Sequence, residues 1–99
     1  MAAINKIIHE PARLRILTFL VTSNKEAVSF NELQKKLEFS SGNLSLQLKK
    51  LSSSDYIKIH KTFKDNKPFT TVSLTPMGSE ALNQYVDEMK KLISSLKKS

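Results

Sequence analysis

Cysteine is absent from this 99-residue sequence, and glycine and histidine occur only twice each. Without cysteine there can be no disulfide, no thiolate metal ligand and no cysteine nucleophile. The two histidines, His9 and His60, are far apart in the chain, so no zinc-ligand cluster is visible, and we expect neither a metal nor a cofactor. The two glycines, Gly42 and Gly78, cannot form a phosphate-binding loop of the GxGxxG type.

Long hydrophobic runs are also missing. The most apolar stretch, residues 14–21, is interrupted by Arg15 and is much shorter than the ~20 residues that a membrane-spanning helix requires. The first residues are charged and lack the apolar segment of a signal peptide. We therefore expect a cytoplasmic protein that does not contact a membrane.

Acidic residues are few relative to basic ones. Lys and Arg number 16 against 9 Asp and Glu, which gives a net charge of +7 and predicts a polyanion or an anionic surface as partner. No nucleophile, base and acid stand at a catalytic spacing, so we expect the protein not to be an enzyme. The length and the 39% hydrophobic content fit a single globular domain over residues 1–99.

Apolar spacing predicts three helices in the first half of the chain. The first covers residues 4–22, with a kink or a break at Pro11. A brief β-prone stretch at residues 27–30 then leads into a second helix that ends near Leu37, and a serine followed three residues later by a glutamate marks its start. A third helix covers about residues 41–53, with Ser40 or Ser41 as its cap.

Residues 56–74 change to the alternating pattern of a β-hairpin. Ile57 and Ile59 alternate with polar residues, and the polar segment 64–67 is rich in turn-forming residues. A threonine and a proline then begin a last helix over about residues 76–97.

The last helix carries apolar side chains at heptad spacing and over more of its circumference than one partner covers. The heptad positions are Leu82, Tyr85, Met89, Leu92 and Leu96. We expect this helix to pack both on its own domain and on a second copy of the chain, together with the N-terminal isoleucines, rather than to form an effector pocket. The predicted dimer interface comprises Ile4, Ile7, Ile8, Tyr85, Met89, Leu92, Ile93 and Leu96.

The order of elements is helix, strand, helix, helix, strand, strand, helix, which predicts a mainly α fold with a small β-hairpin: a winged helix-turn-helix. Residues 11–17, PARLRIL, resemble the opening Pro-x-Arg-x-x-Ile-Leu of small winged helix-turn-helix regulators related to the MarR and ArsR families. Residues 42–51 resemble the recognition helix of these regulators, and residues 74–78, LTPMG, resemble the Leu-Thr-x-x-Gly that follows their wing. The resemblance spans about residues 4–90 and implies a homodimeric prokaryotic transcriptional regulator.

Three positions depart from the family pattern. Leu46 stands where the family often has a basic or large polar residue, Gln47 where it has histidine, and Asp55 where it usually has glycine. The first departure argues against direct base reading by residue 46. The last is easily accommodated, because aspartate tolerates a left-handed turn better than most residues.

The third helix is the predicted recognition helix. Leu44, Leu48 and Leu51 form its buried stripe, so its polar side chains are expected to face outward. Asn and Gln amides can pair with adenine edges, and Leu46 can contact a thymine methyl group. Residues 49–67 hold six lysines against two aspartates, a local +4 that suits phosphate contacts. The predicted DNA-binding residues are Ser40, Ser41, Asn43, Ser45, Leu46, Gln47, Lys49, Lys50, Lys61, Lys64, Asn66 and Lys67.

We therefore predict a sequence-specific regulator of transcription that binds a palindromic operator in double-stranded DNA as a homodimer on the nucleoid. Helix 41–53 would enter the major groove, and the wing, residues 56–74, would lie on the backbone or in the minor groove. Phe63 and Phe69 are expected to pack against the base of the hairpin rather than on a nucleic-acid base. The alternatives are a winged helix that serves as a protein-interaction module of a larger assembly, and binding of RNA or single strands. Whether a small-molecule effector exists is unknown.

Overall fold

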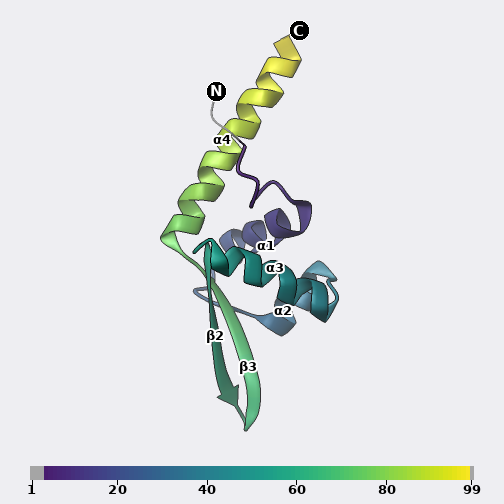
Figure 1. Cartoon of the computed structure of the whole chain (residues 1–99), viewed down its shortest axis with the longest axis vertical. Helices are drawn as coiled ribbons and strands as arrows, with labels where there is room; N and C mark the ends of the chain where they lie inside the picture. The colour runs from purple at the N-terminus through teal and green to yellow at the C-terminus, as the bar shows by residue number, and fades with distance from the viewer. Residues whose placement is uncertain (1–3, 99) are drawn as a thin grey trace.

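The computed structural model describes residues 4–98 and orders them as predicted, with a short strand ahead of the helix-turn-helix and a hairpin after it (Figure 1). The elements are α1 (Pro11–Thr22), β1 (Val28–Ser29), α2 (Phe30–Leu37), α3 (Ser41–Ser53), β2 (Ile57–Lys64), β3 (Lys67–Leu74) and α4 (Pro76–Lys98). The predicted winged helix-turn-helix is confirmed.

The N-terminal helix is shorter than predicted. Residues 4–10 are not helical, with turns and bends over residues 6–10, and α1 begins at Pro11, where the predicted break falls. Asn5 Oδ1 accepts hydrogen bonds from the backbone N–H groups of Ile7 and Ile8, at 3.0 and 3.2 Å, and such a local side-chain bond competes with helix formation. The Glu10 carboxylate then caps α1 by accepting from the backbone N–H of Arg13.

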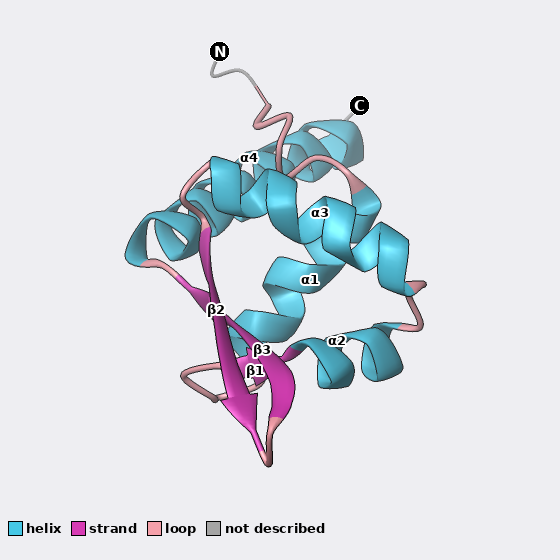
Figure 2. Ribbon diagram, turned by 60° about the horizontal axis from the view of Figure 1, so that its bottom comes forward, coloured by secondary structure: helices cyan, strands magenta, loops and turns pink. Residues whose placement is uncertain are grey.

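The helix-turn-helix has the predicted boundaries. Ser29 Oγ accepts from the backbone N–H of Glu32 at the start of α2, and Ser40 Oγ accepts from that of Asn43 at the start of α3. Between the helices, Glu38 ends α2 in the left-handed conformation with φ 57°. Figure 2 shows α2 and α3 joined by this short turn, with α1 packed beside them.

The three strands pair antiparallel in the order β1-β3-β2. The register of β2 and β3 runs from Ile57 opposite Leu74 to Lys64 opposite Lys67, so the hairpin loop contains only Asp65 and Asn66. Both loop residues have positive φ, 53° and 62°, which is the requirement of the tight turn that matches strand twist. The turn is therefore two residues shorter than the polar segment that predicted it.

The base of the hairpin fixes the start of α4. Thr75 Oγ1 accepts from the backbone N–H of Gly78 at 2.9 Å and donates to the carbonyl of Asp55 at 2.6 Å. Gly78 itself lies against the Tyr56 carbonyl, where a β-carbon would collide with the oxygen. Asp55, which stands where the family usually has glycine, adopts the left-handed conformation with φ 62°.

The hydrophobic core joins the three helices α1 to α3, the sheet and the first half of α4, and it includes residues that were predicted to contact a second copy. Ile8 is completely buried and Tyr85 is 7% exposed within the chain itself. The Tyr85 hydroxyl lies 2.8 Å from His9 Nδ1, which ties α4 to the N-terminal segment. The assignment of Ile8 and Tyr85 to a dimer interface is therefore wrong, because the N-terminal segment folds back over the core instead of continuing α1.

The hairpin and the far half of α4 project from the helical cluster in opposite directions (Figure 1). The principal extents of the chain, 58 × 25 × 23 Å, reflect this elongated shape. Two separate surfaces therefore extend beyond the core: the wing, and the second half of α4.

Candidate nucleic-acid interface

One face of α3 is exposed along the whole helix. Leu46, the most apolar residue on it, is 50% exposed, as its position relative to the leucine stripe predicted. The other exposed side chains of α3 and its cap are Ser40, Ser41, Asn43, Ser45, Lys49, Lys50 and Ser53. This face therefore offers hydroxyl, amide, methyl and ammonium groups together.

Gln47 does not belong to this exposed face. Its side chain is 9% exposed, and its oxygen accepts a hydrogen bond of 2.8 Å from Arg13 Nη1. Gln47 stands three residues after Leu44 and four before Leu51, so it lies on the buried side of the helix with them. The prediction that Gln47 faces outward, and with it the assignment of a base-reading role to this residue, is wrong.

Arg13 holds Gln47 in place and was not singled out as a functional residue from the sequence. The guanidinium is buried, donates through Nε to the carbonyl of Ile7 at 2.6 Å, and lies 3.9 Å from the Glu10 carboxylate. Gln47 Nε2 in turn donates to Asn43 Oδ1 at 3.1 Å. A chain of hydrogen bonds thus runs from the N-terminal segment through α1 to Asn43, the amide on the exposed face. An arginine within the apolar stripe of α1 is the signal that could have revealed it.

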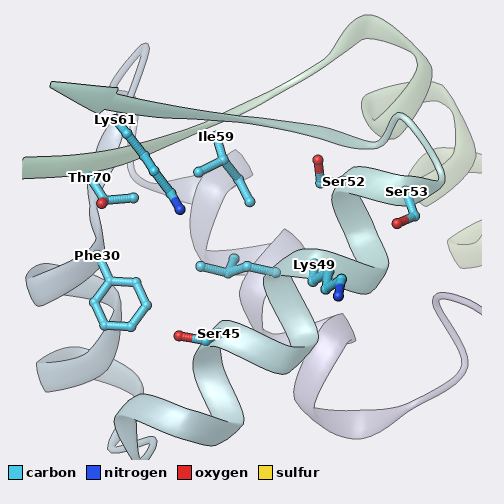
Figure 3. Close-up of a pocket in the computed structure, with 9 residues that line it drawn as sticks. Phe30, Ser45, Lys49, Ser52, Ser53, Ile59, Lys61 and Thr70 are labelled. Atoms are coloured by element: carbon cyan, nitrogen blue, oxygen red, sulfur yellow. The ribbon is translucent and has the colours of Figure 1, made fainter.

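A groove of about 510 Å³ separates α3 from the hairpin. Its lining combines apolar and polar side chains: Phe30, Ser45, Leu48, Lys49, Ser52, Ser53, Ile59, Lys61 and Thr70. Figure 3 shows Lys61 extending from the hairpin across the groove toward α3, while Ser45 and Lys49 line the helix side. The groove therefore has a lysine on each wall.

The hairpin carries further lysines toward its tip. Lys64 and Lys67 pair across the two strands beside the turn residue Asn66, and all three are exposed. Lys64 Nζ lies 5.1 Å from the centre of the Phe69 ring, on the same side of the sheet. Within residues 4–98, none of the lysines of α3 or the hairpin forms an ion pair, so their charge is available to an anionic partner.

Phe63 does not pack as predicted. Its side chain is 77% exposed near the wing tip, whereas Phe69 is half-buried. The end of the hairpin extends beyond the helices (Figure 1), and the described residues leave the Phe63 ring largely uncovered. Only one of the two aromatic residues therefore contributes to the hairpin's own packing.

The described part of the chain brings together no group of three or more side chains suited to hold a metal ion. In residues 4–98 there is also no helix of the length and apolarity needed to cross a bilayer.

A helix-turn-helix followed by a basic hairpin defines the winged helix class of proteins. Residues 12–93 match the family model of the winged helix DNA-binding domain, and the chain belongs to this family. It is thus a DNA-binding protein of the transcriptional regulator type and not an enzyme. The resemblance to MarR-related regulators is confirmed at this level.

The chain is also similar to two solved regulator structures and to one curated relative. A transcriptional regulator homologue from Pyrococcus horikoshii is 30% identical, with a TM-score of 0.82 over 91% of this chain and 87% of that one. A putative MarR-family regulator from Porphyromonas gingivalis is 26% identical, with a TM-score of 0.68 over 87% of this chain and 80% of that one. An uncharacterised protein of Methanocaldococcus jannaschii is 30% identical over 91 residues, which cover 92% of this chain and 97% of that protein.

Proposed function

We propose that the protein is a homodimeric, sequence-specific regulator of transcription that binds a palindromic operator. The observation that carries the proposal is the exposed polar face of α3 beside a groove with a lysine on each wall. The proposed place of action is the nucleoid in the cytoplasm.

In this proposal α3 lies in the major groove, which is wide enough to admit a helix. Asn43 contacts an adenine edge and Leu46 a thymine methyl group, since both are exposed on the same helix. The exposed residues Ser40, Ser41, Ser45 and Lys50 would contact phosphates or base edges around them. Gln47 supports Asn43 instead of touching DNA.

The groove between α3 and the hairpin would receive one strand of the DNA backbone. Lys49 on the helix wall and Lys61 on the hairpin wall would then contact its phosphates from two sides. Lys64, Asn66 and Lys67 at the tip would reach the adjoining minor groove or its phosphates. Such contacts give affinity and orientation but carry no sequence information.

The second half of α4 is the proposed dimer surface. Leu92 is 42% exposed and Ile93 is 52% exposed, which leaves an apolar surface without cover from the domain. The other residues of the proposed surface are Ile4 and Leu96, which are exposed, and Ile7 and Met89, which are half-buried. Because α4 projects away from the hairpin, a second copy packed there leaves the wing uncovered (Figure 1). A two-fold dimer would place its two α3 helices ~34–36 Å apart, one turn of DNA.

The test is a selection of bound fragments from random duplex DNA, followed by fluorescence anisotropy on the best duplex and a scrambled one. The proposal expects an enriched palindrome, bound much more tightly than the scrambled duplex. Enrichment of a single half-site would contradict the dimer. Absence of any duplex binding would overturn the proposal and favour a protein-interaction module.

A further inference from the structure

Phe63 is an aromatic side chain that the fold leaves uncovered. At 77% it is the most exposed of the large hydrophobic residues in the part of the chain that the structure describes. It stands between Lys61 and Lys64 on β2, close to the end of the hairpin. A large apolar ring in this position contributes little to the stability of the fold and is accessible to a partner outside the chain.

The register of the hairpin places Phe63 on the side of the sheet that lines the groove. Lys61 lies opposite Thr70, and Phe63 lies opposite Pro68, two residues further along both strands. Because side chains two residues apart in a strand share a face, Phe63 continues the face of Lys61 beyond the groove. The ring therefore faces the same side as the surface on which the DNA backbone is proposed to lie.

The distance from Lys61 to Phe63 along the strand is comparable with the width of a minor groove. Two residues along a strand advance by ~6.6 Å, and the minor groove of B-DNA is ~6 Å wide. If Lys61 contacts a backbone phosphate from the groove wall, the Phe63 ring stands one such step further along the wing, beyond that backbone. In that arrangement the ring would face the adjoining minor groove.

The charges around the ring favour DNA as the occupant. Lys61, Lys64 and Lys67 surround the tip, against the single acid Asp65. Lysine is depleted in the cores of protein interfaces, whereas lysines next to an apolar wedge are suited to a minor groove lined by phosphates. We propose that Phe63 inserts as an apolar wedge at a base step of the minor groove, unstacks the step and bends the duplex. This inference rests on the proposed function, since it requires that the wing contacts DNA.

The test compares Phe63→Ala and Phe63→Leu with the matched control Thr62→Ala, which alters the neighbouring residue on the opposite face of the same strand. The full-length protein is titrated into the duplex selected from random DNA, with a donor and an acceptor dye at its two ends. A second set of duplexes carries 2-aminopurine at successive positions to report unstacking. A thermal melt checks that each variant is folded, as expected for so exposed a position.

We expect the wild type and Thr62→Ala to shorten the distance between the duplex ends and to raise 2-aminopurine fluorescence at one step in each half-site. Phe63→Ala should abolish both signals and weaken binding about tenfold. Its log–log salt slope should stay unchanged, because no phosphate contact is lost. Phe63→Leu should retain most of the bend, since leucine also serves as a wedge.

Several outcomes would overturn the inference. If the wild type binds the duplex and Phe63→Ala bends it equally, the wedge is wrong and the proposed function stands. If Phe63→Ala has a lower mass than the wild type in light scattering, the ring contacts a second copy of the chain instead of DNA. Binding to phosphatidylserine vesicles that depends on Phe63, with no bend in DNA, would assign it to a lipid surface. If the wild type binds no duplex, both proposals fail together.

Discussion

The guanidinium of Arg13 on α1 donates a hydrogen bond of 2.8 Å to Gln47 Oε1 on α3, and both side chains are buried. The bond fixes the orientation of the Gln47 amide, because its oxygen is directed to Arg13 and its nitrogen to Asn43. Gln47, which the sequence suggests as a base-contacting residue, therefore holds the side chain of Asn43 instead. The same bond couples the N-terminal segment, through the Ile7 carbonyl, to the proposed recognition helix.

Gln47→Leu should destabilise the protein by about 1–3 kcal/mol, because it leaves a buried guanidinium N–H without its acceptor. Arg13→Met should be destabilising as well. The double variant should cost less than the sum of the two, because removing both partners of a buried bond is cheaper than removing one. Urea unfolding of the four proteins measures the coupling energy. Strictly additive effects would show that the bond contributes nothing of its own.

Comparison of the sequence-based expectations with the structure separates local features from tertiary contacts. The caps at Ser29 and Ser40 and the hairpin turn were predictable, because local hydrogen bonds and turn-forming residues determine them. The burial of Gln47 follows from its spacing to Leu44 and Leu51, but its hydrogen bond to Arg13 does not, because the spacing within α3 says nothing about which residue of α1 packs against it. The position of Ile8 also depends on a tertiary event, the folding of the N-terminal segment over the core.

Asn43→Ala and Lys64→Ala should weaken DNA binding in different ways. Loss of the Asn43 amide should cost about 1–3 kcal/mol on the best duplex and much less on a scrambled one, because it removes a base contact. Loss of Lys64 should weaken binding to both duplexes equally and flatten the log–log salt slope by about 0.9. Anisotropy over a salt series measures both effects. A change of sequence preference in Lys64→Ala alone would make the wing the reader instead of α3.

Gly78→Ala should be destabilising, by roughly 1–3 kcal/mol, because the added methyl group collides with the Tyr56 carbonyl and forces α4 away from the hairpin. Gly42→Ala is the matched control. A β-carbon at Gly42 meets nothing within 4 Å, so alanine there should be neutral or stabilise α3 by up to about 1 kcal/mol. Thermal unfolding of the two variants compares them directly. Equal effects would show that helix propensity, and not the contact with Tyr56, decides the outcome at Gly78.

Leu92→Lys combined with Ile93→Lys should convert a dimer into a monomer, because two charges would have to be buried in the proposed interface. Light scattering should report about twice 11.2 kDa for the wild type and about 11.2 kDa for the variant. The matched control, Gln84→Lys with Ser94→Lys, adds the same charge at exposed polar positions of α4 and should remain dimeric. On DNA, the Leu92 and Ile93 variant should lose affinity for the palindrome while it still binds a half-site weakly, since α3 and the wing are intact. A wild type that is monomeric at micromolar concentration and still binds the palindrome tightly would exclude α4 as the dimer surface.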